Sequence, residues 1–175
     1  MKDILLNISP EQAYSILERL WDRGGDIQKT IKMEAKNILI SVDIDEVAQD
    51  IFFALDFIDV HDLWDRSGAN RDGYISPEDM AMEMIEDELS QFCDQIEKYH
   101  NLEMYEEERI YCMGVLKGLY IYEKESKSEF KDWATDIPGE CFNSVLDNWR
   151  DRVLKNDHII EMDSFLKEVC PDWIK

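Results

Sequence analysis

Residues 65–79 have the sequence DRSGANRDGYISPED and join two segments whose apolar residues recur at helical spacing. The stretch is close to the pattern of a calcium-binding EF-hand loop, in which oxygen ligands alternate along twelve residues around a central Gly. An ordinary turn between two helices would use many of the same residue types. The stretch therefore decides whether a bound cation or backbone geometry places the two helices.

The EF-hand pattern is incomplete here. With Gly73 as the central Gly, the side chains that fall on ligand positions belong to Asn70, Asp72, Ser76 and Asp79. The first ligand position falls on Gly68, which has no side chain to offer. At the last position Asp79 is one methylene shorter than the usual bidentate Glu.

A structural turn explains the same residues without a cation. Gly68 can end the first helix, Asp72-Gly73 favours a turn, and Ser76-Pro77 favours the start of the next helix. We therefore predict a structural turn, with no metal-binding residues and no cofactor. Isothermal titration tests this: calcium affinity of micromolar or tighter that Asp72→Ala abolishes would favour the EF-hand alternative.

Signals for helix starts are strong elsewhere along the chain. Ser9-Pro10-Glu11-Gln12 combines a capping hydroxyl, Pro at the first helical position and Gln for a capping box. Gly24-Gly25 ends this helix, and Asp26 can cap a second one. Asp43 with Glu46 forms another capping box for a third helix through about residue 55, and a short helix is expected at 60–66.

Two long helices are predicted next. The helix after Ser76 has a continuous apolar stripe, formed by Ala81, Ile85, Leu89, Phe92, Ile96 and Tyr99. Its opposite face is acidic, with Glu83, Glu86, Asp87, Asp94 and Glu97. The helix predicted at 103–123 is apolar on nearly all sides, so we expect it to be the most buried element. Gly114 and Gly118 lie on one of its faces, where a neighbouring helix can approach closely.

These patterns predict an all-α fold of about seven to eight helices in a single domain over residues 1–175. Asp136-Ile-Pro138 starts another helix that ends near residue 153, and a short helix follows Asp163. The fold is either an irregular helical bundle or a short HEAT-like stack of helix pairs. A faint repeat favours the stack, because LWDRGG at 20–25 resembles LWDRSG at 63–68, 43 residues later. Chance similarity between Trp-containing helices is the alternative.

The net charge of −21 is the strongest global feature. It opposes binding to nucleic acid, which needs clustered Lys and Arg, and it disfavours an anionic membrane surface. A basic protein partner would be attracted. The four cysteines form no Cys-x-x-Cys pair, which favours buried free thiols in a reducing cytosol. The longest apolar stretch, residues 110–122, is too short to span a bilayer, so we predict a cytoplasmic protein.

The sequence signals for catalytic residues are weak. Glu97 and His100 have the Glu-x-x-His spacing of di-iron bundles, but no second pair of this kind accompanies them. His158 and Glu161 have the reverse order. A His favoured by the end of its helix is the simpler interpretation of His100. No catalytic residue is predicted.

A resemblance to a known helical region rests on several short stretches: Asp62 to Gly68, Gly73-Tyr74, Pro77, residues 118–120, Trp133 and residues 136–138. Residues 43–153 resemble a helical region of uncharacterised prokaryotic proteins that in some cases accompanies a SWIM zinc finger. The Cys and His ligands of the finger itself are absent here, so the resemblance implies no metal or nucleic-acid role. It implies no catalytic residues either.

We therefore expect a non-enzymatic module that offers an acidic helical surface to a protein partner. A calcium- or metal-responsive protein that uses residues 68–79 is a second hypothesis. An enzyme whose site is assembled only in three dimensions is a third, and a pocket that gathers Asp, Glu, His and Arg side chains would favour it.

Overall fold

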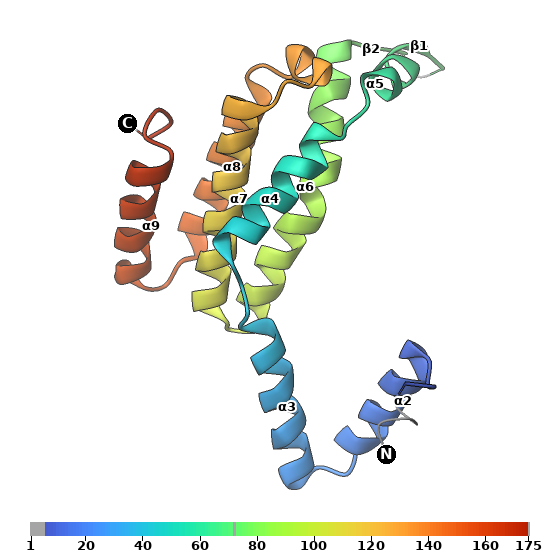
Figure 1. Cartoon of the computed structure of the whole chain (residues 1–175), viewed down its shortest axis with the longest axis vertical. Helices are drawn as coiled ribbons and strands as arrows, with labels where there is room; N and C mark the ends of the chain where they lie inside the picture. The colour runs from blue at the N-terminus through green and yellow to red at the C-terminus, as the bar shows by residue number, and fades with distance from the viewer. Residues whose placement is uncertain (1–5, 72, 175) are drawn as a thin grey trace. The chain divides into compact units, whose positions relative to one another are not determined.

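The computed structural model describes residues 6–71 and 73–174, without the side chain of Asn70. The described residues form eight α-helices, a short 3-10 helix and two very short strands (Figure 1). The predicted all-α class is confirmed. The chain divides into two compact units, the N-terminal unit (Met1–Ser41) and the C-terminal unit (Val42–Lys175). The single domain expected over 1–175 stays a prediction beside this division.

The N-terminal unit contains two helices, α2 (Pro10–Trp21) and α3 (Gly25–Leu39). The predicted capping box opens α2: the Ser9 hydroxyl accepts the Gln12 backbone N–H, and the Gln12 side chain accepts the Ser9 N–H. The predicted cap by Asp26 is wrong, because α3 begins one residue earlier. Gly24 and Gly25, at φ 65° and 62°, turn the chain directly into the helix and leave Asp26 in its first turn.

The C-terminal unit holds the remaining elements: α4 (Ile44–Asp56), α5 (Val60–Arg66), β1 (Gly68–Asn70), β2 (Gly73–Ile75), α6 (Pro77–Asn101), α7 (Tyr105–Glu125), the 3-10 helix η1 (Glu129–Trp133), α8 (Ile137–Arg152) and α9 (Asn156–Val169). Helix α7 packs against α4, α6, α8 and α9, so it is the centre of this unit (Figure 1). Its Cys112, Leu116, Leu119 and Tyr122 are fully buried. The predicted stripe of α6 is buried as well, from Ala81 to Tyr99.

Helices α4 and α7 approach each other at two glycines. A Cβ atom added at Gly114 would lie 2.6 Å from the Cβ of Val47. One added at Gly118 would lie 2.6 Å from the Cβ of Ile51 and 2.8 Å from the carbonyl oxygen of Ala48. Side chains at these two positions would therefore hold the helices apart. The predicted close approach at this pair of glycines is confirmed.

Two expectations need correction. The last helix was expected after Asp163 but begins at Asn156. Its N-cap residue, Lys155, makes no side-chain hydrogen bond, so no capping signal in the sequence marks this start. The thiols are all free, but only Cys112 and Cys170 are buried, whereas Cys141 is half-buried and Cys93 is exposed. Among the described residues, no helix combines the length and apolar character needed to cross a membrane.

Candidate functional site

The stretch between α5 and α6 forms an antiparallel hairpin. Gly68 pairs with Ile75, and Asn70 pairs with Gly73. Gly68 and Gly73 have φ angles of 100° and 148°, a region that L side chains rarely adopt. The Ser76 hydroxyl accepts a hydrogen bond from the Asp79 backbone N–H at 3.1 Å and opens α6, as predicted. Backbone pairing, glycine geometry and a helix cap thus join the two helices.

The candidate calcium ligands are placed only in part. The Ser76 hydroxyl is engaged in the cap, and Asp79 lies in the first turn of α6. Asp72 and the side chain of Asn70 lie outside the described residues. Within the described part of the chain, no group of three or more His, Cys, Asp or Glu side chains could hold a metal ion. A loop without a bound metal stays a prediction.

The net negative charge belongs to the C-terminal unit alone. Residues 1–41 contain six basic and six acidic side chains, so the whole excess of −21 arises from residues 42–175. The predicted acidic face of α6 is exposed over its full length, at Glu83, Glu86, Asp87, Asp94 and Glu97. An approaching cation would therefore be attracted to this unit and not to the other.

A cleft of about 360 Å³ lies in this acidic surface, where α4 ends and meets α5 and α6. We call it the phenylalanine cleft. Its aromatic wall is formed by Phe53 and Phe57, whose rings stack with centroids 5.7 Å apart and an angle of 14°. Phe53 is 48% exposed and Phe57 is 78% exposed. Two large apolar rings thus meet water side by side and form a contiguous exposed apolar surface, the kind of surface that binding sites use.

Carboxylates line the phenylalanine cleft beside the two rings. They belong to Asp59, Asp62, Asp87 and Glu88. Asp59 also caps α5, where its carboxylate accepts the His61 backbone N–H at 2.8 Å. Arg66 is the single cation of the lining, and it lies 3.4 Å from Asp87 and 3.8 Å from Glu83. The cleft therefore keeps an excess of negative charge around an apolar wall.

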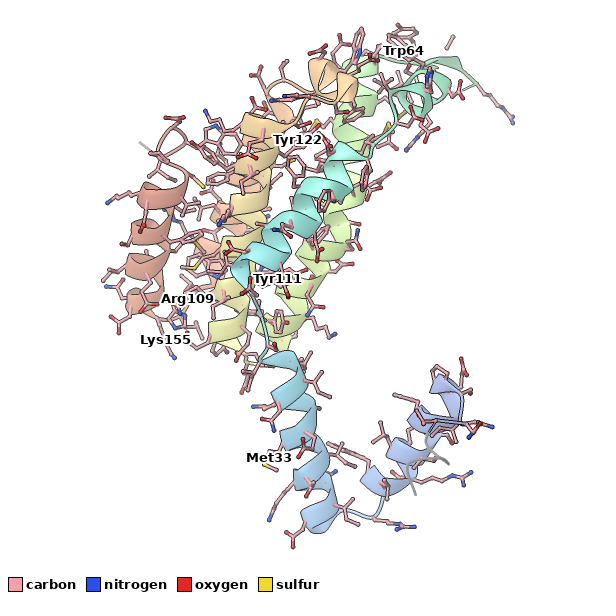
Figure 2. All side chains as sticks on the ribbon, in the orientation of Figure 1. Met33, Trp64, Arg109, Tyr111, Tyr122 and Lys155 are labelled. Carbon is pink, nitrogen blue, oxygen red and sulfur yellow. The ribbon has the colours of Figure 1, made fainter. Side chains whose placement is uncertain are left out.

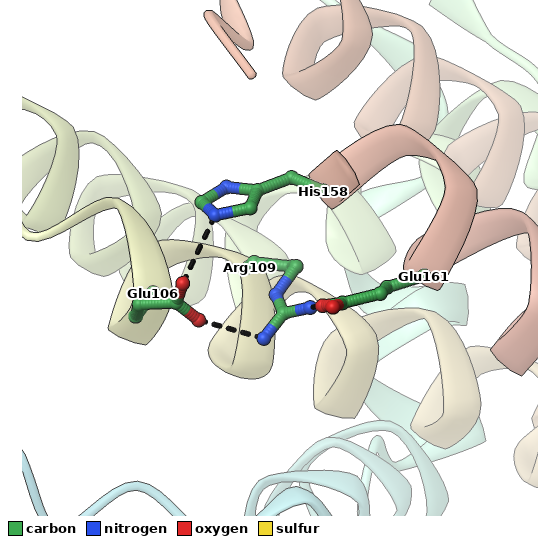
Figure 3. A network of polar contacts seen from close by, with 4 residues as sticks. All are labelled: Glu106, Arg109, His158 and Glu161. Atoms are coloured by element: carbon green, nitrogen blue, oxygen red, sulfur yellow. Dashed lines mark hydrogen bonds and ion pairs between the residues drawn. The ribbon is translucent and has the colours of Figure 1, made fainter. Parts of the chain in front are cut away.

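A second polar group lies where α9 meets the start of α7 (Figure 3). Arg109 pairs with Glu106 of its own helix at 2.7 Å and with Glu161 of α9. Glu106 also lies 3.0 Å from the Nε2 atom of His158. Burial would raise the pKa of Glu106, but Arg109 and His158 outweigh it and hold that pKa below its ordinary value. Each charged side chain has a partner of opposite charge within the group. We therefore interpret the group as a structural contact that joins α7 and α9.

A third polar group surrounds Glu108, which is only 3% exposed. One carboxylate oxygen lies 3.1 Å from the Nδ1 atom of His100, and the other lies 3.3 Å from the Nε atom of Arg152. The three side chains come from α7, α6 and α8 respectively. His100 is in the last turn of α6, as expected, but its partner is Glu108 and not Glu97, which is exposed. These contacts join the end of α6, the start of α7 and the end of α8.

Phe53 and Phe57 were not predicted as site residues from the sequence. Their separation by four residues places Phe53 in the last turn of α4 on the same side as the C-cap residue Phe57, and Asp59 and Asp62 follow within five residues. That pattern is a usable signal for an aromatic pair beside acid. What the sequence lacks is any sign that this face is left uncovered, since an aromatic pair on a helix is ordinarily part of the core.

No protein-family model, no curated protein and no solved structure matches this chain. The resemblance of residues 43–153 to a helical region of uncharacterised prokaryotic proteins therefore stays a prediction.

Proposed function

We propose that this chain is a non-enzymatic interaction module whose C-terminal unit binds an arginine-bearing segment of a basic protein partner. The observation that carries the proposal is the phenylalanine cleft, where two exposed aromatic rings stand beside four carboxylates. The confinement of the net charge of −21 to residues 42–175 supports it, because this charge draws a cation toward the unit that contains the cleft.

The chemistry of the cleft favours arginine over other side chains. The face of an aromatic ring attracts a guanidinium group, and Phe57 leaves most of its surface open to such contact. The planar guanidinium can at the same time donate two parallel hydrogen bonds to one carboxylate, such as that of Asp62 or Glu88. A lysine ammonium makes a point contact and stacks less well. An arginine-containing segment therefore uses both walls of the cleft.

Binding can be measured with a fluorescent nona-arginine peptide as the probe, by anisotropy at low and at high salt. We expect the affinity to fall as salt rises, because the attraction is electrostatic. The same measurement with a nona-lysine peptide should give weaker binding. Phe57→Ala should weaken binding of nona-arginine by about threefold to tenfold, which corresponds to the loss of an aromatic contact with a cation.

The matched control is Tyr74→Ala. Tyr74 is 71% exposed, close to the 78% of Phe57, and it lies on β2 outside the lining of the cleft. We expect it to leave the affinity unchanged. Equal losses for Tyr74→Ala and Phe57→Ala would reject the cleft as the binding site. Binding of the probe that ignores ionic strength would reject the acidic module as a whole.

A further inference from the structure

The N-terminal unit exposes an apolar surface that its own two helices do not cover. None of the residues of α2 or α3 is buried. Ile16, Leu17 and Trp21 on α2 are 44%, 48% and 38% exposed, and Met33 and Ile38 on α3 are 55% and 77% exposed. Met33 projects from the side of α3 in Figure 2. Helices of this length are marginal in water unless an apolar face is packed, so the pair needs a partner.

A cleft of about 580 Å³ runs along this surface within the unit. Tyr14, Leu17, Trp21 and Ile31 form its apolar lining, and Glu18 and Asp22 stand at its edge. Lys32 lies 5.4 Å from the centroid of the Trp21 ring, which ties α3 to α2 beside the cleft. The cleft can take apolar side chains from another pair of helices, as knobs of one helix fill holes of its neighbours.

The charge of this unit differs sharply from that of the rest of the chain. Its six basic and six acidic side chains cancel, whereas residues 42–175 carry the full −21. A strongly charged partner would therefore gain nothing from the N-terminal unit. A surface of equal and interspersed charges is instead complementary to a second copy of itself, because each copy offers both signs to the other.

We propose that the N-terminal unit is a self-association module: the exposed apolar faces of α2 and α3 pack against those of a second copy of this chain. Two helix pairs joined in this way form a four-helix bundle, with the apolar stripes inside and the mixed charges at the rim of the interface, where the two copies meet. The interface is isologous, so the same residues serve on both copies. This inference is independent of the proposed binding of a basic partner, which uses the other unit.

The charge distribution gives self-association a distinctive salt dependence. Each copy brings a C-terminal unit of charge −21, and these two units repel each other. Salt screens this repulsion, leaves apolar packing intact and costs little in exposed ion pairs at the rim, so the dimer should become tighter as ionic strength rises. Binding of a basic partner to the acidic unit has the opposite dependence. The two proposals can therefore fail separately.

Sedimentation equilibrium of the full chain tests the inference, with a reducing agent present. From about 1 to 200 µM we expect the mass to rise from the monomer value of 20.7 kDa to twice that value. Raising the salt should move this rise to lower protein concentration. Leu17→Glu places a charge in the apolar cleft and should weaken the dimer by about tenfold or more.

Leu154→Glu is the matched control, because it adds the same charge at an apolar residue that is 75% exposed in the C-terminal unit. It should leave the dissociation constant unchanged. Circular dichroism of both variants checks that the helices persist, and the salt dependence of the unsubstituted chain tests the proposal without any variant. A chain that stays monomeric at about 200 µM in high salt overturns the inference. A dimer that ignores Leu17→Glu, or that dissociates as salt rises, overturns it equally.

Discussion

At the scale of single residues, two helical glycines of this chain stand in opposite surroundings. A Cβ atom at Gly118 would lie 2.6 Å from the Ile51 Cβ and 2.8 Å from the Ala48 carbonyl oxygen, whereas one at Gly139 would meet nothing within 4 Å. The obstacle at Gly118 is the backbone and a β-branched side chain of α4, which cannot yield without moving that helix. Gly118 thus sets the distance between α4 and α7.

Gly118→Ala should lower the free energy of unfolding by about 1–3 kcal/mol, the usual cost of a methyl group forced into a packed core. Gly139→Ala, in α8, should instead raise it by up to about 1 kcal/mol, because Ala is the better helix former and no neighbour is disturbed. Urea unfolding followed by far-UV circular dichroism measures both. If the two substitutions changed stability in the same direction, the steric account of Gly118 would fail.

The features that were predictable at this scale depend on a residue and its near neighbours along the chain. Ser9 and Ser76 cap α2 and α6 because a hydroxyl before Pro satisfies backbone N–H groups a few residues on. Gly114 and Gly118 could be recognised because two small residues four apart share a helix face. The cap of α3 was wrongly assigned to Asp26. The sequence does not show that Gly24 and Gly25 adopt positive φ angles, which start the helix one residue before Asp26.

At the scale of elements, the end of α8 is held by two arginines with different partners. Arg152 contacts Glu108, whose side chain is 4% exposed, while its own side chain is 29% exposed. Arg150 contacts Asp163 of α9 at 2.7 Å, and these two side chains are 38% and 40% exposed. Water can solvate the exposed Asp163 carboxylate if Arg150 is removed, but it has little access to the buried Glu108 carboxylate if Arg152 is removed. The two ion pairs should therefore differ in their contribution to stability.

Arg152→Met should destabilise the fold by about 2–4 kcal/mol, somewhat below the usual cost of leaving a buried charge unpaired, because His100 remains beside Glu108. Arg150→Met is the matched control on the same helix and should cost no more than about 1 kcal/mol, as surface ion pairs do. Both values come from urea unfolding at neutral pH. A loss for Arg150→Met as large as that for Arg152→Met would show that burial of Glu108 is not the cause.

Contacts between helices far apart in the chain could not be predicted from the sequence. Glu106 and His158 meet at 3.0 Å although 52 residues separate them, and helical periodicity carries no information about which helices become neighbours. The start of α9 was missed because Lys155 provides no capping hydrogen bond. The exposure of Phe53 and Phe57 was also missed, because it depends on whether another helix packs over their rings. The starts of α2 and α6 were predictable because side chains cap them, whereas the starts of α3 and α9 and the candidate cleft were not.

At the scale of the whole molecule, a net charge averaged over the chain hides its division. The −21 belongs to residues 42–175, where apolar side chains are also buried, and the N-terminal unit is neutral with no buried residue in α2 or α3. The buried and half-buried groups of the C-terminal unit include thiols and phenols that are neutral only while they keep their protons. Burial raises the pKa of Cys141 to about 11 and that of Cys170 to about 12. Burial, with nearby Tyr99 and Asp50, raises the pKa of Tyr111 to about 12.

These raised pKa values predict that the fold loses stability in alkali. Above the ordinary thiol pKa of 9.0 the unfolded chain releases protons that the folded chain retains until about pH 11 or 12. The unfolded state then binds fewer protons, so the free energy of unfolding falls with rising pH, by up to about 1.4 kcal/mol per pH unit for each such thiol. Urea unfolding at pH 7.5, 9.0 and 10.5 in a reducing buffer measures this slope. Cys141→Ser removes one of the titrating groups and should make the slope above pH 9 shallower. A transition midpoint that did not change up to pH 10.5, or a slope that Cys141→Ser left the same, would contradict the assignment of these thiols as groups that keep their protons in the folded state.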